Sequence, residues 1–527
     1  MELVPSRATS DAPVDSEPAV STSGRHAAGV AILVFVGLFA VYLSNGDFLP
    51  CSDATATTYL PLHLIGGELS FTPANAPFMF DVDPEGGPAL KRGSYIVPTT
   101  RGTWANTFGF GTAVVAVPAF VVARLVFGPE IAGRHDVIWF TAKVAASAMV
   151  AGSGAFVFLA ALRFTTWRRA VLIALAYGLG TCVWTLSSQA LWQHPANELF
   201  VALGAWCFVR GWRLPGDVAA PHWGWAAGAG LAWSWAVACR PTSLLLLAAA
   251  GVGLAIVHRR SAVALLVGAV PVGLVLAVHN ALLFGSPVRF GQTVHTATAS
   301  EYLARKGVES PWTWAVWDGA AGLLLSPSRG LLVYSPFLVF ALVGMVRASR
   351  DPRWSPLRPL VVGTLLTWLV AFAWFDWWGG WSYGYRPIVD TAPLLALLLV
   401  PVLPTVLGAP ARRIAFALLL AWAVGVQALG AFAYNARGWN HRLVFEMVMA
   451  DGSTVVTADL DEVDRLTAAG GLSRRAAVLN VDLPENRHRL WSVTDSQILF
   501  YLGNLERSRE TKKRDQAAWL RQFVDAP

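Results

Sequence analysis

Charged residues are scarce in this chain of 527 residues. They make up 14% of it, whereas about one quarter is usual for globular proteins. Hydrophobic residues make up 55%, and the mean hydropathy is +0.50, so an ordinary soluble fold is excluded. Apolar runs of about 18 residues or more, separated by short arginine-bearing loops, instead predict membrane-spanning helices. Because the runs are continuous rather than alternating, helices are favoured over a β-barrel.

Signatures of several other function classes are missing. The net charge of +7 is not accompanied by a C2H2, RNP or basic-helix pattern, so nucleic acid is not an expected partner. There is no P-loop and no GxGxxG after a strand, so no nucleotide site is expected. Four cysteines lack the spacing of metal ligands, and we interpret them as small apolar fillers. They are Cys51, Cys182, Cys207 and Cys239.

The positive charge is informative about topology. If residues 108–127 (FGFGTAVVAVPAFVVARLVF) crossed the membrane, the RFTTWRR loop at 163–169 would lie outside, against the positive-inside rule. We therefore predict that 108–127 lies in the membrane interface or re-enters, which puts the later arginine-rich loops inside. About eleven spans result. They are residues 27–44, 137–162, 170–188, 195–211, 223–238, 242–257, 262–284, 331–346, 357–375, 388–405 and 414–434.

This topology predicts three regions. Residues 1–26 are polar and form a disordered cytoplasmic tail, and because no A-x-A-like site ends the following apolar stretch, the first span is retained. Residues 27–434 form the membrane domain, with outer loops at 45–136 and at about 285–330. Residues 435–527 form a small extracytoplasmic α+β domain, with a β-like run at 442–449 and 453–458 and an amphipathic helix near 495–523. The predicted fold class is an all-α polytopic membrane protein with this appended domain.

Two carboxylates follow the first span, in SNGDFLPCSDATATTYLPLHLI. Asp47 stands at the membrane boundary, where an acid is commonly a solvated helix end. Asp53 lies between Ser52 and Thr55 and precedes an amphipathic stretch, so a helix is expected to hold it against the membrane body. Such a carboxylate can take a proton from a hydroxyl as a general base.

A polar group surrounds a predicted helix boundary in SSQALWQHPANE. His194 precedes a proline, which disfavours helix at that position. A lone histidine is more often a structural hydrogen-bonding group than a catalyst. Here Gln193 and Trp192 are adjacent to it, which favours a polar pocket.

Three arginines stand at the predicted outer ends of spans, where cations are costly and usually functional or paired. They are Arg240 in CRPTS, Arg329 in SPSRGLLVYSP and Arg386 in FDWWGGWSYGYRPIVD. Guanidinium groups bind phosphate bidentately, so we assign these arginines, with His194, to a phosphate site. Aromatic faces beside hydrogen-bonding groups suit a sugar. The proposed sugar or acceptor pocket consists of Trp192, Gln193, Asn280, Trp378, Trp381 and Tyr383.

On these residues the chain resembles the GT-C superfamily, the integral-membrane glycosyltransferases that use polyprenyl-phosphate-linked sugars. The resemblance covers about residues 27–434: a first span, a long outer loop with an early aspartate, and interfacial helices. The segments GDFLPCSDATATTYLPLHLI, SSQALWQH, CRPT, SPSRGLLVYSP and WWGGWSYGYRP also resemble a group of bacterial membrane proteins. One departure is YIVPTTRGTWANTFGFG, where relatives commonly have a Pro-Pro or Pro-Gly pair.

The resemblance implies that Asp53 is the catalytic acid of the first loop, with Asp47 as its near rival. It implies inverting transfer from a polyprenyl-phosphate sugar to an envelope glycan, lipid or protein, in a bacterial inner membrane. Metal is not assigned, since acid-rich loops are usually just solvated, although carboxylates suit a hard cation. Those acids are Asp47, Asp53, Asp81, Asp83 and Glu85. The alternatives are a transporter or flippase for a lipid-linked or anionic substrate, and a non-catalytic membrane scaffold.

Overall fold

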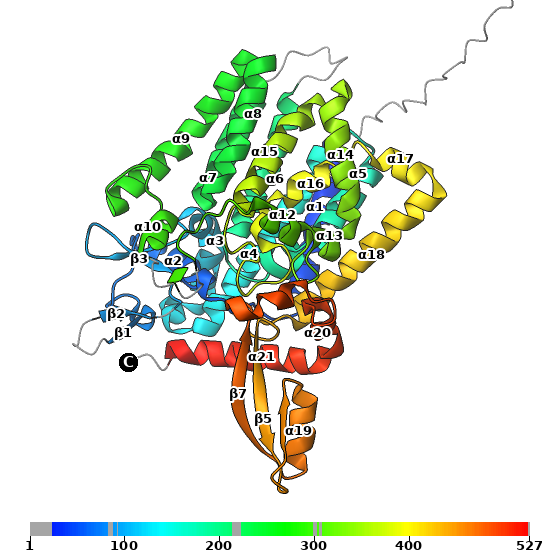
Figure 1. Ribbon diagram of the computed structural model, residues 1–527. Helices are drawn as coiled ribbons and strands as arrows, with labels where there is room; N and C mark the ends of the chain where they lie inside the picture. Colours follow the sequence, from blue (N-terminus) through cyan, green and yellow to red (C-terminus); the bar gives the residue numbers. More distant parts are fainter. Residues whose placement is uncertain are drawn as a thin grey trace, which may run out of the picture.

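A computed structural model describes residues 24–82, 88–91, 93–212, 223–298, 303–304 and 308–524. These residues form a mainly helical molecule with small antiparallel sheets. Figure 1 shows the long helices side by side, with the sheets and several short helices gathered at one end. The four cysteines are free and buried, as expected of apolar fillers.

The helical body agrees with a membrane protein. Five segments among the described residues are long and apolar enough to cross a membrane, and they contain 20 to 27 residues each, as a hydrocarbon core about 30 Å thick requires. They are Gly24–Leu43, His135–Ala161, Arg259–Phe284, Pro352–Phe372 and Pro410–Ala433. The full number of crossings, about eleven, stays a prediction. The main helices of the body are α1 (Gly24–Leu43), α4 (His135–Ala161), α5 (Trp167–Gly180), α6 (His194–Gly211), α7 (Trp223–Cys239), α8 (Leu244–Val257), α9 (Arg259–Phe284), α14 (Val339–Arg350), α15 (Arg358–Phe372) and α18 (Pro410–Ala433).

Two predicted spans are interrupted rather than continuous. The 331–346 segment divides into α13 (Leu331–Tyr334), a 3-10 turn at Pro336–Leu338, and α14. The break falls at Ser335, whose backbone is not helical, as expected of a residue before proline. The 388–405 segment divides into η8 (Arg386–Thr391), α16 (Ala392–Leu397) and α17 (Leu403–Gly408).

The segment predicted as the first outer loop, residues 45–136, folds as helices and two hairpins among its described residues. Its strands pair β1 with β2 and β3 with β4, both antiparallel. A second outer segment carries α10 (Gly291–Thr298) and α12 (Val316–Leu325). The elements of the first loop are η1 (Ser52–Ala54), α2 (Thr55–Ile65), η2 (Pro77–Met79), β1 (Phe80–Val82), β2 (Pro88–Leu90), β3 (Ile96–Pro98), β4 (Trp104–Asn106), α3 (Gly111–Phe127) and η3 (Pro129–Gly133).

The segment 108–127, expected to lie in the interface, forms the single helix α3. Its last two turns expose apolar side chains: Val122 is 60% exposed, Leu125 80% and Val126 69%. Such a surface suits contact with lipid. The orientation of α3 relative to the bilayer stays a prediction.

The region after α18 contains the expected strands and one more. β5 (His441–Val448) pairs with β6 (Thr454–Thr457), as predicted, and also with β7 (Leu472–Asn480), giving the antiparallel order β6-β5-β7. The sheet and α19 (Leu460–Ala468) project away from the helical body (Figure 1). The predicted helix at 495–523 divides into α20 (Gln497–Gly503) and α21 (Leu505–Val524), after the turn η9 (Pro484–Trp491).

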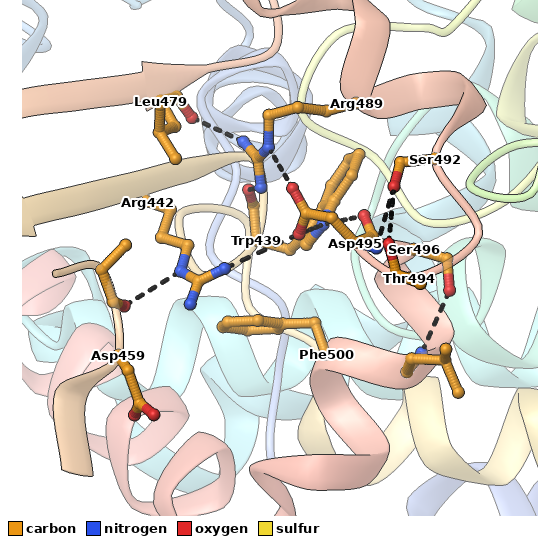
Figure 2. A network of polar contacts seen from close by, with 12 residues as sticks. Trp439, Arg442, Asp459, Leu479, Arg489, Ser492, Thr494, Asp495, Ser496 and Phe500 are labelled. Carbon is orange, nitrogen blue, oxygen red and sulfur yellow. Dashed lines mark hydrogen bonds and ion pairs between the residues drawn. The ribbon is translucent and has the colours of Figure 1, made fainter. Parts of the chain in front are cut away.

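An ionic network around the buried Arg489 fastens this sheet at its base (Figure 2). Arg489 donates to the carbonyl oxygens of Leu479 at 2.8 Å and Trp439 at 3.0 Å, and to Asp495 Oδ2 at 2.7 Å. Arg442 approaches the other oxygen of Asp495 at 3.6 Å. Because Asp495 binds both arginines, the sheet and the turn before α20 form one unit.

Helix α21 connects this C-terminal region to the first outer loop. The Trp519 ring lies 5.6 Å from the Trp139 ring, and the Phe523 ring lies 5.6 Å from the Tyr59 ring. In addition, Lys91 Nζ donates to the carbonyl oxygen of residue 522 at 3.2 Å. Both apolar and polar contacts therefore hold α21 against the loop that carries Asp53.

Candidate functional site

Proline positions two of the site residues at helix ends. His194 is the first residue of α6 and Pro195 follows it, which costs nothing because the first-turn N–H groups have no partner within the helix. Arg240 follows the last residue of α7 in an extended conformation, before Pro241 begins the 3-10 turn η5 (Pro241–Ser243). Both side chains thus extend from positions where helices begin or end, and not from the middle of a continuous helix.

Glycines shape the segment that leads to Arg386. Gly379, Gly380 and Gly384 have φ angles of +69°, +63° and +59°, in the left-handed region that residues with a Cβ avoid. Asp376 accepts a hydrogen bond from the backbone N–H of Gly380 at 3.1 Å. These three glycines therefore have a conformational reason.

The structure brings Asp53 together with Arg386. Their side chains form an ion pair with an Nη2–Oδ2 distance of 2.9 Å, and they are 15% and 22% exposed. The Arg386 guanidinium also lies 4.5 Å from the centre of the Trp192 ring, a favourable cation–π geometry. Asp53 at the start of α2, Trp192 before α6 and Arg386 at η8 thus share one site.

A second acid–arginine pair lies beside the first. Asp390 Oδ1 is 3.0 Å from His194 Nδ1, and Asp390 Oδ2 pairs with Arg240 Nη1. Arg240 Nη2 also donates to the carbonyl oxygen of Pro387 at 3.3 Å, the residue after Arg386. We name the four residues of the two pairs, together with Trp192 and His194, the outer site. They are Asp53, Trp192, His194, Arg240, Arg386 and Asp390.

Asp390 belongs to the outer site although the sequence assigns it no role. It stands in the FDWWGGWSYGYRPIVD segment, four residues after Arg386. Its residue type and its spacing from Arg386 can therefore be read from the sequence. Its partners are 196 and 150 positions away in the chain. Such pairings follow from the tertiary fold, and no local pattern predicts them.

The outer site has spare hydrogen-bond donors. Among the described residues, the Trp192 indole N–H has no partner although the side chain is buried. In the same part of the chain, Asp53 is the only polar partner of the Arg386 guanidinium, which has five N–H donors. An anion that entered here would meet two partly exposed guanidinium groups, those of Arg240 and Arg386.

Two of the predicted pocket residues lie near α9 and α10. Gln193 Oε1 accepts from Gln292 Nε2 of α10 at 3.4 Å, so the second outer segment reaches the border of the outer site. Asn280 near the end of α9 is buried and donates to the carbonyl oxygen of Pro287 at 3.4 Å. Within the described residues it makes no polar contact with the outer site.

Arg329 is placed in a separate network. It is fully buried, and its five N–H donors bind five acceptors at 2.7 to 3.2 Å. These acceptors are the carbonyl oxygens of Ser328, Trp378 and Gly380 and the side-chain oxygens of Asn440 and Gln497. With all its donors engaged, Arg329 has none left for a phosphate, and we leave it out of the outer site.

The aromatic residues of the glycine-rich segment contact the C-terminal region or the helical body. The Trp378 indole N–H donates to Asp482 and that of Trp381 donates to Asn480, both at 2.9 Å. Tyr383 is buried and donates to the carbonyl oxygen of Val426 at 2.8 Å. Trp378 and Trp381 therefore contact the base of the sheet, and Tyr383 contacts α18 of the helical body.

Asp47, the rival of Asp53, lies near a different pair of cations. It interacts electrostatically with Lys143 of α4 and Lys512 of α21, both buried. Burial lowers the pKa of Lys512 to about 8, and the charge of Asp47 opposes that shift. Among the described residues, Asp47 makes no ion pair with an arginine.

The acidic residues of the first loop are of the type that can bind a hard cation. Asp83 and Glu85 lie outside the described residues. Among the residues that the structure does describe, no group of three or more His, Cys, Asp or Glu side chains is arranged to hold a metal ion.

Comparison with known proteins gives similarity at the level of whole structures. No family model matches the chain, and no curated protein matches it. Among solved structures, the chain is similar to ArnT from Cupriavidus metallidurans bound to undecaprenyl phosphate, at 13% identity and a TM-score of 0.49, over 95% of this chain and 78% of that one. It is also similar to the oligosaccharyltransferase AglB from Archaeoglobus fulgidus in complex with an inhibitory peptide and a dolichol-phosphate, at 14% identity and a TM-score of 0.46. That alignment covers 78% of this chain and 57% of the archaeal one.

Proposed function

We propose that this protein is a membrane glycosyltransferase that moves a sugar from a polyprenyl-phosphate donor to an acceptor outside the cytoplasm. The observation that carries the proposal is the Asp53–Arg386 ion pair beside Arg240 in the outer site. A carboxylate for the acceptor proton and two guanidinium groups for a leaving phosphate are what such a transfer needs. The resemblance of the segments around these residues to the GT-C superfamily supports the same assignment.

The proposed reaction is a single inverting displacement. Asp53 takes the proton of the acceptor hydroxyl as its oxygen attacks the anomeric carbon of the sugar. The bond between that carbon and the phosphate oxygen breaks, and its electron pair leaves with the polyprenyl phosphate. Arg240 and Arg386 stabilise the negative charge that develops on the phosphate, because preorganised cations act strongly in a site with little water.

The proposed topology places this chemistry outside the cytoplasm. The residues of the outer site come from the first outer loop, from η8 and from helix ends that the positive-inside rule puts on the outer side. The tail at 1–26 would then be cytoplasmic, and the C-terminal region at 435–527 extracytoplasmic. The extracytoplasmic acceptor is an envelope glycan, lipid or protein.

The test is transfer from radiolabelled polyprenyl-phosphate sugars in membranes that contain the full chain. Wild type is expected to transfer label to an acceptor fraction, Asp53→Asn to lose transfer, and Asp47→Asn to keep it. Loss in the Asp47 variant alone would move the base to that residue. Movement of the lipid across vesicles without transfer would favour a transporter, and no effect of any outer-site variant would favour a scaffold.

A further inference from the structure

Asp390 holds two different residues with its two carboxylate oxygens. Oδ1 lies 3.0 Å from His194 Nδ1, and Oδ2 pairs with Arg240 Nη1. His194 begins α6, Arg240 follows α7, and Asp390 lies in η8. One carboxylate therefore joins three segments of the outer site.

The hydrogen bonds fix where the histidine proton lies. His194 Nδ1 is close to Asp390 Oδ1 and also 3.2 Å from Arg240 Nη1. Arginine can only donate and a carboxylate can only accept. Nδ1 cannot donate to Asp390 and accept from Arg240 at the same time. Because Arg240 Nη1 already pairs with Asp390 Oδ2, we assign the Nδ1 proton to the bond with Asp390, which makes Nε2 the acceptor nitrogen of the neutral imidazole.

Burial distinguishes Asp390, which orients its neighbours, from Arg240, which can contact a ligand. The side chains of His194 and Asp390 are 3% and 8% exposed, whereas that of Arg240 is 19% exposed. Asp390 thus lies behind the guanidinium. It can act on a bound anion through Arg240, but it does not face one.

We propose that Asp390 is a positioning residue that aligns Arg240 with the leaving phosphate and fixes His194 as a hydrogen-bond acceptor. Through Oδ1 it holds the His194 ring, whose Nδ1 lies 3.2 Å from Arg240 Nη1, in one orientation beside the guanidinium. Through Oδ2 it holds the guanidinium in one orientation, which a charge-assisted pair does well. This role rests on the proposed function, because the anion at Arg240 is there the donor phosphate.

The informative variant is Asp390→Asn, which keeps the shape and changes the bonds. An amide has one acceptor oxygen and one donor NH₂ group, so it cannot accept from both His194 and Arg240. If the NH₂ group faces His194, the imidazole proton moves from Nδ1 to Nε2, and Nε2 is no longer an acceptor. Asp390→Glu keeps a two-oxygen acceptor and should recover part of the function.

Two measurements on the purified full-length protein test the role: binding of a polyprenyl phosphate, and the KM and kcat of transfer. We expect Asp390→Asn to weaken polyprenyl phosphate binding at least tenfold and to lower kcat at least tenfold. Asp495→Asn is the matched control, because Asp495 also pairs with arginines but lies at the base of the C-terminal sheet. It should lower the melting temperature and leave polyprenyl phosphate binding and kcat nearly unchanged.

A double variant separates positioning from general stability. If Asp390 acts on kcat through Arg240, Asp390→Asn combined with Arg240→Lys should lose no more kcat than the worse single variant. Independent, additive losses would overturn the role. So would unchanged binding and kcat in Asp390→Asn at an unchanged melting temperature.

Failure of the inference and failure of the proposed function have different signatures. If Asp390→Asn does not fold, Asp390→Glu decides, because its longer carboxylate shifts both partners, and unchanged KM and kcat in it would overturn the role. If wild type binds polyprenyl phosphate and the variants bind it equally well, only the proposed role of Asp390 is overturned. Wild type that binds no polyprenyl phosphate overturns the proposed function and the role together.

Discussion

Asp53 and Arg386 form an ion pair at 2.9 Å between the first outer loop and the start of η8. The proposed base is thus neutralised by the cation that is proposed to receive the leaving phosphate. A donor phosphate that binds Arg386 competes with Asp53 for the same N–H groups. Donor binding would then release the carboxylate for the acceptor proton, which links the presence of donor to activation of the acceptor.

Replacing the base tests this relationship. Asp53→Asn should lower kcat by roughly 10²- to 10⁴-fold, the usual contribution of a general base. Its effect on polyprenyl phosphate binding should be small or favourable, because Arg386 no longer has a carboxylate partner. Transfer kinetics and lipid binding measured on the same preparation check both parts. Asp47→Asn is the matched control, and an Asp53 variant with full kcat would exclude Asp53 as the base.

Arg386→Lys tests the other partner of the pair. A lysine keeps the charge but loses the planar fork and the stacking on Trp192. We expect the KM for the donor to rise about tenfold or more, with a smaller change in the KM for the acceptor. Arg350→Lys, at the end of α14, is the control. Equal changes in both KM values would mean that Arg386 does not distinguish donor from acceptor.

Gly384→Ala tests the turn that presents Arg386. Gly384 has φ +59°, and an added Cβ would lie 2.6 Å from Cys182 Sγ and 2.9 Å from a Tyr334 ring carbon. Left-handed backbone and overpacking together should lower the free energy of unfolding by about 2 to 4 kcal/mol. Gly452→Ala is the control, since φ there is +81° with no atom within 4 Å, and should cost about 1 kcal/mol. Thermal unfolding in detergent measures both, and equal losses would show that the Cys182 contact is unimportant.

The sequence predicted best those elements whose pattern lies within a short stretch of neighbouring residues. Apolar runs and their caps are local, so α4, α6, α7 and α9 begin and end within a few residues of the predicted spans. The alternation in residues 442–458 likewise predicted β5 and β6. The strand β7 was missed, because in LSRRAAVLN the polar residues SRR and the apolar residues AAVL form two blocks and do not alternate with a period of two.

The site was predicted by residue type but not by partner. Unusual polar residues at helix ends pointed to Asp53, His194, Arg240 and Arg386, and the structure brings these four together. Arg329 shows the same sequence signal, a cation beside a span, yet its donors are used by three backbone carbonyls of the helical body and by two side chains of the C-terminal region. Only tertiary contacts distinguish an arginine that binds a neighbouring domain from one that is open to a ligand.

Lys512 gives α21 a pH dependence whose sign can be worked out. Burial lowers its pKa from 10.5 to about 8, despite the opposing charge of Asp47. Between these values the unfolded chain binds more protons than the folded one, so the free energy of unfolding rises with pH from about 8 to 10.5. Lys512→Met should remove this rise, which is roughly 3 kcal/mol at most. Thermal unfolding at pH 7 and pH 10 measures it.

The comparison between variant and wild type isolates this lysine from its neighbours. Lys143, Asp47 and Arg509 also interact electrostatically in this region, but they are unchanged in Lys512→Met. The variant also loses the hydrogen bond to the carbonyl oxygen of Ala431, at 2.7 Å, which shifts the whole curve by a constant. Parallel curves for variant and wild type would contradict the assignment.

Arg329→Lys separates a structural arginine from a ligand-binding one. A lysine has three donors and cannot reach the five acceptors that Arg329 binds. Unsatisfied buried acceptors should cost about 2 to 4 kcal/mol and loosen the C-terminal region, so limited proteolysis within residues 435–460 should accelerate. Arg474→Lys is the control, because that arginine is 76% exposed and its pair with Glu446 lies on the surface. Polyprenyl phosphate binding per folded molecule should be unchanged in both, and a loss confined to Arg329→Lys would return Arg329 to the phosphate site.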